Sequence, residues 1–422
     1  MKVLFSLETL FIFSLFPWTT FNVLNLPSSE ISVFPFIFLI GYILFNKIKI
    51  DNKIIFIIFF FIIGILISLI IGSDFQFNLV LRSFYNYFMF LILLIIFFQE
   101  KEKVLKTLPR IIFIVNIIWI IFACVQFLEI YNYNFASRWS GSFAFDEAST
   151  GRGVYSFAPE PSFFAFFLIF CSWIIFIKNN FKIKNFKKNE IFLIFFNFLS
   201  IVFLCKSTLG VIIAFTIISI FSLEILIRYN FNSKNRFSNL IICFFTIYVF
   251  LCFYVIFMEQ LNFDNNRSLK FINNVLNDKS YFFYAFENDE SISSRIENIL
   301  FPVTGFFYNY TLPGGLSGYN FMREDLNLYY NNVFSCSSPN CEFFSGQKIM
   351  SVFGDIIFQL GIFGIISIFF IFKLCLNSKI NYTYSNLASL FLIFLMAIPI
   401  NFVLLPYLIT MISNYEKNKV KI

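Results

Sequence analysis

Eleven long apolar stretches, separated by short polar segments and by one polar loop of about 90 residues, dominate this chain of 422 residues. Each stretch is close to the ~20 residues that an α-helix needs to cross a bilayer. Because 59% of the residues are hydrophobic, a water-soluble fold could not cover so much apolar surface. We therefore predict an all-α integral membrane protein, a polytopic helical bundle of about 11–12 transmembrane helices with one large loop. The predicted spans cover residues 3–20, 31–46, 54–71, 79–98, 110–130, 161–178, 190–205, 208–228, 238–258, 350–372 and 385–413.

The complete absence of histidine limits the chemistry of this chain. Histidine is the commonest acid–base group and metal ligand, so any catalysis would use carboxylates, Lys, Arg or Tyr. We expect no metal site and no cofactor. The net charge of +7 comes from basic residues in short loops between spans, where such residues orient a membrane protein. This placement argues against nucleic acid as a partner.

The cysteines fall into two groups. Six of the eight lie within or at the ends of apolar stretches, where they behave as small hydrophobic residues. Cys336 and Cys341 instead flank Ser-Ser-Pro-Asn, a turn sequence inside the large loop. We predict a disulfide between these two residues if the loop faces an oxidising compartment.

The basic residues also predict the orientation. With a cytoplasmic N-terminus, the cytoplasmic segments carry 21 of the 31 Lys and Arg residues, as the positive-inside rule requires. The N-terminal stretch lacks a small-x-small cleavage site, so we interpret it as an uncleaved first helix. The abundance of Phe, Ile, Asn and Lys indicates an AT-rich bacterial genome and hence a multi-pass protein of the bacterial inner membrane. We predict an N-terminal transmembrane bundle (1–258), a large periplasmic loop (259–349), and C-terminal helices with a cytoplasmic tail (350–422).

The last apolar region, 385–413, is too long for one untilted span and short for two. Pro399 and Pro406 interrupt it. The basic tail after it favours a broken helical hairpin that returns to the cytoplasm, because broken helices are tolerated where protein or a cavity covers the freed backbone groups. One tilted, kinked helix is the alternative.

The segment from Arg138 to Ser162 joins two spans on the predicted periplasmic side. Pro161 suits the first helical position, and Glu160 and Ser162 flank it where backbone N–H groups and the helix dipole favour anions. Glycines on both sides of Arg152 permit close approach of a ligand to the backbone. Two interpretations stay open. The segment is either a solvated loop with a helix cap or a site that gathers two arginines and a carboxylate at the membrane surface.

Several motifs together resemble a known family. Gly-Arg-Gly at 151–153, followed by Phe-x-x-Glu-Pro-Ser at 157–162 and a span, resembles the bacterial O-antigen and capsule polymerases of the Wzy type. Residues 206–210 (Lys-Ser-Thr-Leu-Gly) are similar to the family's Ser-rich junction between two spans. Residues 354–364 resemble the start of its helix after the large loop. The related O-antigen ligases commonly carry a His near the end of that loop, which this chain lacks.

The resemblance implies a metal-independent membrane glycosyltransferase. Its reaction would be the polymerisation of undecaprenyl-diphosphate-linked oligosaccharide repeat units at the periplasmic face. Implied partners are the lipid-linked oligosaccharide, membrane lipid and a chain-length regulator protein. An O-antigen ligase, or a non-enzymatic flippase for lipid-linked oligosaccharide, is the alternative.

Candidate site residues follow from the same motifs. Arg guanidinium groups suit a diphosphate because they form bidentate contacts at any pH. Glu160 is the first candidate for the base that activates the acceptor hydroxyl, and Asp355 is the second. The candidates for the diphosphate or the developing charge are Arg138, Arg152, Lys206 and Arg295. Further substrate-binding candidates are Ser207, Arg323 and Lys348.

The charged residues near helix ends also have structural interpretations. Arg295 lies in a capping box that predicts a short helix ended by Pro302 and Gly305, and it has the alternative of pairing with Glu297. Asp355 and Gln359, four residues apart, are predicted to share a helix face. Snorkelling to the interface is the alternative for Asp355. Glu224 is predicted to pair with Arg228 on the next turn of the same span.

Overall fold

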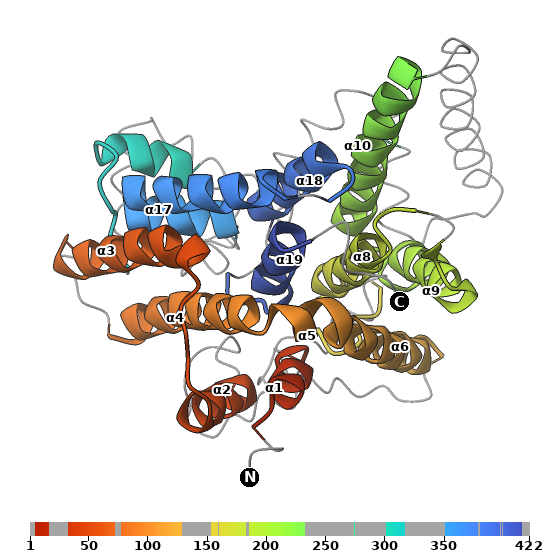
Figure 1. Cartoon of the computed structure of the whole chain (residues 1–422), viewed down its shortest axis with the longest axis horizontal. Helices are drawn as coiled ribbons and strands as arrows, with labels where there is room; N and C mark the ends of the chain where they lie inside the picture. The colour runs from red at the N-terminus through yellow and green to blue at the C-terminus, as the bar shows by residue number, and fades with distance from the viewer. Residues whose placement is uncertain are drawn as a thin grey trace. The chain divides into compact units, whose positions relative to one another are not determined.

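The computed structural model describes residues 5–16, 33–71, 77–128, 153–158, 160–182, 185–232, 274, 301–316, 351–378, 380–396, 398 and 400–415. Within these residues all regular structure is helical (Figure 1). Five of the described helices are long and apolar enough to cross a membrane, and four shorter ones are also apolar. The predicted all-α class is confirmed, whereas the total number of spans stays a prediction.

The chain divides into two compact units. Unit 1 comprises Met1–Leu108, Phe282–Ser378 and Leu390–Glu416, and unit 2 comprises Pro109–Tyr281, Lys379–Ser389 and Lys417–Ile422. The helices of unit 1 are α1 (Leu7–Ser14), α2 (Val33–Phe45), the 3-10 helix η1 (Asn52–Ile54), α3 (Ile55–Ile71), α4 (Phe77–Gln99), α5 (Lys101–Lys106), α17 (Val352–Leu376) and α19 (Leu404–Ser413). Unit 2 holds α6 (Leu108–Phe127, from its second residue), α8 (Pro161–Lys178), α9 (Lys188–Leu199), the π-helix η4 (Ser200–Leu204) and α10 (Thr208–Asn232). The first half of α18 (Thr383–Leu395) belongs to unit 2 and its second half to unit 1.

The core of unit 1 is the contact between α3 and α17. A Cβ atom at Gly64 would lie 3.1 Å from Leu360 Cβ and 3.3 Å from Phe363 Cβ, so the small residue lets the two helices approach closely. The short α19 is buried along almost its whole length and contacts α4, α5 and α17. The hydroxyl of Tyr407 on α19 donates to the backbone oxygen of Val104 (2.9 Å).

Helix α17 is broken at Gly361, a feature that was not predicted from the sequence. This glycine has φ 57° and ψ −139°, outside the helical region. A Cβ at Gly364 would lie 2.6 Å from the backbone oxygen of Ile356. In a continuous helix residues eight apart are about 12 Å apart along the axis, so the chain must reverse at Gly361. Figure 1 shows the two parts of α17 side by side. The first part runs from 352 to 360 and the second from 362 to 376.

The break leaves backbone groups of α17 without partners inside the helix, and residues 301–316 form hydrogen bonds with them. Gly314 N donates to Phe358 O (2.8 Å), and Ile362 N donates to Thr311 O (2.9 Å). Ser68 Oγ on α3 donates to Gln359 O. A broken helix in a membrane protein is tolerated when its freed groups are satisfied in this way. Because residues 301–308 are helical, the prediction that Pro302 and Gly305 end a helix is wrong.

Unit 2 is held together by buried polar contacts between its helices. Asn116 on α6 and Asn197 on α9 are both fully buried. Asn116 Nδ2 donates to Asn197 Oδ1 (3.0 Å), and Asn197 Nδ2 donates to Ser172 Oγ on α8 (2.8 Å). Hydrogen bonds of this kind hold apolar helices together in lipid, where the hydrophobic effect cannot.

The C-terminal region is interrupted as predicted. The break lies between the end of α18 at Leu395 and the start of α19 at Leu404. Pro399 lies outside the described residues, and Pro406 does not interrupt a helix as predicted but lies in the first turn of α19, where proline is tolerated. The predicted return to the cytoplasm stays a prediction. Glu224 has a role that the sequence did not indicate, because its Oε2 accepts a hydrogen bond from Ser385 N (2.6 Å) in the first turn of α18. The side chain of Arg228, its predicted partner, lies outside the described residues.

Candidate functional site

Residues 153–158 of unit 2 are fixed between α6 and the end of η4. Val154 N donates to Leu204 O (2.8 Å). Ser156 is fully buried, and its Oγ donates to Trp119 O (2.8 Å). Gln126 Oε1 accepts from Ser156 N (2.8 Å), while Gln126 Nε2 donates to Ser156 O (3.2 Å). Residues 153–158, the described part of the predicted loop, are therefore held by hydrogen bonds to α6 and η4 and lead into α8.

Gly153 brings this segment against the turn between η4 and α10. A Cβ atom at Gly153 would lie 2.1 Å from the backbone oxygen of Cys205 and 2.3 Å from that of Leu204, which leaves no room for a larger residue. The sequence analysis interpreted the glycines around Arg152 as room for a ligand. For Gly153 the structure shows that the close neighbour is the chain itself.

Glu160 lies immediately before Pro161, the first residue of α8, as the sequence predicted. Its carboxylate accepts a hydrogen bond from Ser162 Oγ (3.1 Å) and is half-buried. The carboxylate makes no capping hydrogen bond to the N–H groups of α8. These groups at the start of α8 carry the positive end of the helix dipole.

Lys206 and Ser207 form the tight turn that the sequence predicted between two helices. Lys206 has φ 47°, a left-handed conformation that non-glycine residues adopt mainly where a sharp reversal demands it. Ser207 Oγ accepts from Gly210 N (3.2 Å) and so caps the first turn of α10. We call Gly153, Glu160, Lys206 and Ser207 the junction site.

The junction site combines the N-terminal ends of two helices. A Cβ at Gly210, in the first turn of α10, would lie 2.4 Å from Ala165 Cβ in the second turn of α8. Towards their other ends, the rings of Phe181, just after α8, and Phe221 on α10 stack at 4.7 Å. The two helices therefore run in the same direction with their positive ends together. Two such ends beside a lysine form an environment that favours an anion.

A second charged cluster lies in unit 1 at the broken helix. The charge of Asp355 on α17 acts on the guanidinium of Arg82 on α4. Gln359 Nε2 donates to Asp355 Oδ1 (2.6 Å), which confirms the predicted shared face. Tyr87 OH donates to the backbone oxygen of Asp355 (3.1 Å). We call Arg82, Asp355 and Gln359 the α17 cluster.

The α17 cluster contains one unsatisfied group. Among the described residues, Gln359 Oε1 is one of a few buried side-chain atoms without a hydrogen-bond partner, and Gln359 as a whole is only 8% exposed. A buried acceptor left unpaired costs about 1–3 kcal/mol. Such an atom therefore calls for an explanation, and a ligand with a donor group is one.

The structure covers only part of the predicted site. Glu160, Lys206 and Ser207 lie at the adjacent N-terminal ends of α8 and α10 in unit 2, and Asp355 lies in unit 1, so each cluster is described by itself. The remaining predicted site residues lie outside the described residues: Arg138, Arg152, Arg295, Arg323, Lys348, Cys336 and Cys341. Their roles stay predictions.

Arg82 is a charged residue of the α17 cluster that was not predicted from the sequence. The signal was present, since Arg82 is the one charged residue in the 23 residues of α4. An isolated charge within an apolar span usually faces protein and marks a functional position.

No family model, no curated protein and no solved structure matches this chain. The resemblance to the Wzy polymerases therefore rests on the motifs quoted above.

Proposed function

We propose that this protein polymerises oligosaccharide repeat units carried on a polyprenyl diphosphate, at the periplasmic face of the bacterial inner membrane. The observation that carries the proposal is the junction site. There the positive ends of α8 and α10 lie side by side, Glu160 immediately precedes α8, and Lys206 lies two residues before the start of α10. The motifs that resemble the Wzy family contain the residues of this site. The positive helix ends and Lys206 suit a diphosphate leaving group, and the carboxylate of Glu160 suits an acceptor hydroxyl.

In this mechanism the growing chain is transferred from its diphosphate to a hydroxyl of the next lipid-linked unit. Glu160 takes the proton of the attacking hydroxyl, and the bond between the sugar and the diphosphate breaks. Lys206 and the N–H groups at the two helix ends stabilise the charge that develops on the departing diphosphate. Arg138, Arg152 and Arg295 are the further candidates for this anion.

Glu160 suits the role of base better than Asp355. The Asp355 carboxylate already accepts from Gln359 and faces the positive charge of Arg82. Asp355 thus already joins two helices, whereas the described contact of the Glu160 carboxylate is local, with Ser162. We therefore assign Asp355 to the contact between α4 and α17.

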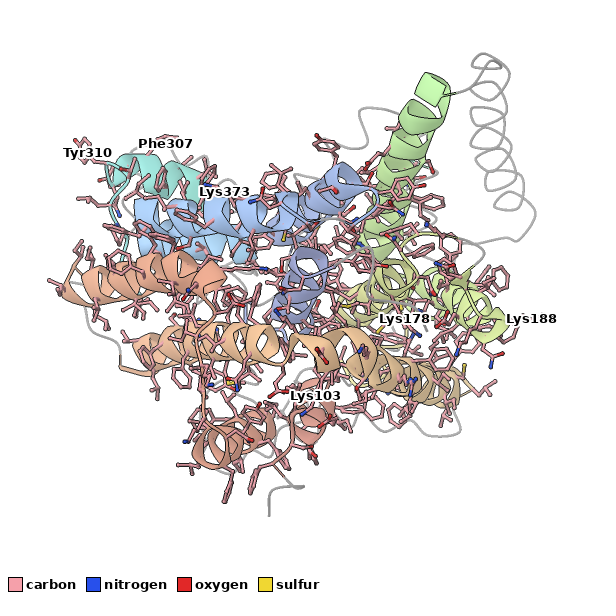
Figure 2. All side chains as sticks on the ribbon, viewed as in Figure 1. Lys103, Lys178, Lys188, Phe307, Tyr310 and Lys373 are labelled. Atoms are coloured by element: carbon pink, nitrogen blue, oxygen red, sulfur yellow. The ribbon has the colours of Figure 1, made fainter. Side chains whose placement is uncertain are left out.

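The test compares glycan chain length in strains whose chromosomal copy is replaced by Glu160→Gln or Lys206→Gln. Removing the general base at Glu160 should slow elongation by about 10²–10⁴-fold. Losing the charge-assisted contact of Lys206, about 2 kcal/mol, should slow it roughly 30-fold. Glu102→Gln on α5 and Lys188→Gln on α9 are the control variants, because both side chains are exposed. Lys188 is labelled in Figure 2. Membrane protein levels are compared by blotting.

The glycan that accumulates separates the alternatives. Single-unit glycan in both site variants, with long chains in both controls, supports polymerisation. Long chains that remain on the lipid carrier would indicate a ligase. Normal chains in both site variants at normal protein level would refute the assignment of the junction site.

A transporter of lipid-linked oligosaccharide is the second candidate, and one observation favours it. Discontinuous helices with charged groups inside the bundle are typical of secondary transporters. The α17 cluster has both features and an unpaired acceptor at Gln359. For a transporter, disrupting this cluster should trap single lipid-linked units on the cytoplasmic side, whereas the junction variants should have no specific effect.

A further inference from the structure

Residues 301–316 form a surface element whose exposed side chains are apolar. Tyr310 is 87% exposed, Phe307 65% and Leu312 52%. Figure 2 shows the side chains of Phe307 and Tyr310 pointing away from α17. This segment was predicted to belong to the water-exposed loop, where such side chains would be unfavourable.

The whole segment carries no charge. None of the 16 residues from 301 to 316 is Asp, Glu, Lys or Arg. The short helix α5 provides the contrast, because four of its six residues are charged. A segment that faced water on one side would be expected to show polar residues there.

The segment is also fixed at the end of the membrane-spanning helices. Thr311 and Gly314 form backbone hydrogen bonds with the residues of α17 around its break. Gln359, next to the same break, accepts a hydrogen bond from Ser68, which lies three residues before the end of α3. Ser83 Oγ on α4 donates to Leu316 O (3.1 Å), about two turns from the start of that helix. The segment therefore lies where α3 ends and α4 begins.

The exposed face continues an apolar surface that already belongs to the spans. The N–H of Ile362 on α17 donates to the backbone oxygen of Thr311, the residue before Leu312. The side chains of Ile362 and Leu312 are both exposed. Ile70, in the last turn of α3, is 82% exposed. Tyrosine and phenylalanine are suited to the boundary between hydrocarbon and head groups, because their rings enter the apolar layer and the tyrosine hydroxyl stays hydrated.

From these observations we infer that residues 301–316 are a membrane-interface element whose face of Phe307, Tyr310 and Leu312 docks on the lipid at the end of the spans. The element covers the break in α17 on one side and contacts lipid on the other. This inference does not depend on the proposed function, because it rests on the packing of unit 1 alone.

Tryptophan fluorescence tests the inference in the full-length protein. Phe307→Trp and Tyr310→Trp are each reconstituted into nanodiscs of phosphatidylcholine, either plain or brominated near the carbonyl end of its chains. The emission of the parent protein is subtracted. Phe59→Trp, exposed in the second turn of α3, is the lipid-facing control, and Lys103→Trp, on α5, is the water-facing control.

Both test variants should lose emission in brominated lipid, more than Lys103→Trp does, and should be less sensitive to soluble acrylamide than Lys103→Trp. Acrylamide quenching at the level of Lys103→Trp, without quenching by lipid, would place the face in water and overturn the inference. Protection from both quenchers would overturn it as well, because protein would then cover the face. Two separate positions keep the test decisive if one variant folds poorly.

Discussion

Replacing Gly361 by alanine should destabilise unit 1 far more than an ordinary glycine substitution does. The backbone at Gly361 has φ 57° and ψ −139°, a region that is essentially restricted to glycine. The added Cβ would also lie 2.6 Å from the carbonyl carbon of Leu312 and from the nitrogen of Pro313. These are backbone atoms, so no side-chain rotation can relieve the contact.

The expected size of the effect has two parts. The backbone strain costs of the order of 1–3 kcal/mol. Moving residues 311–314 away from the break weakens the hydrogen bonds Gly314 N to Phe358 O and Ile362 N to Thr311 O, each contributing about 1 kcal/mol. The free energy of unfolding should therefore fall by about 3–5 kcal/mol.

Equilibrium unfolding of the purified protein in mixed micelles of increasing SDS content measures this change. Gly64→Ala is the matched control, because it lies in the same α3–α17 contact and its new Cβ would meet only side-chain atoms, at 3.1 Å or more. Slight overpacking there should cost about 1 kcal/mol. If Gly361→Ala lowers the free energy of unfolding no more than Gly64→Ala does, the chain reversal at Gly361 is refuted.

Three further predictions concern polar contacts. In a double-mutant cycle, Asn116→Leu and Asn197→Leu should each destabilise the protein, and the double variant should show a coupling of about 1 kcal/mol by SDS unfolding; additive effects would contradict the hydrogen bond. Glu224→Gln removes a carboxylate from the N-terminus of α18 and should cost about 0.5–1 kcal/mol in the same assay, and an unchanged stability would argue against capping. Cys336 and Cys341 should resist alkylation until a reductant is added, as mass spectrometry of the alkylated loop peptide would show; free labelling of both thiols would exclude the disulfide.

Local rules in the sequence were sufficient for most helix boundaries. Pro161 begins α8 because proline needs no N–H partner in the first turn. Ser207 caps α10, and the four-residue spacing of Asp355 and Gln359 gives the hydrogen bond that helix geometry predicts. These features depend on residues within one or two turns of each other, so a single sequence reveals them.

The break in α17 could not be predicted in the same way. Gly361 lies in an apolar run that fits a continuous span, and glycine within such spans is common. What permits the reversal is a segment about 50 residues earlier, whose Thr311 and Gly314 satisfy the freed backbone groups. The hydropathy pattern carries no information on that pairing, and for the same reason the sequence assigned residues 301–316 to a loop in water.

The α17 cluster shows how such a long-range contact changes a functional interpretation. Considered alone, Asp355 near the end of a span was a candidate base, and Arg82 was not a candidate. Their electrostatic contact links α4 to the part of α17 that precedes the break. Removing either charge would leave the other half-buried without its partner, which is costly in a membrane protein. Loss of activity in an Asp355 variant would therefore not by itself identify a catalytic base. Glu160 is the more direct test of acid–base chemistry, because the described contact of its carboxylate, with Ser162 two residues away, does not join two helices.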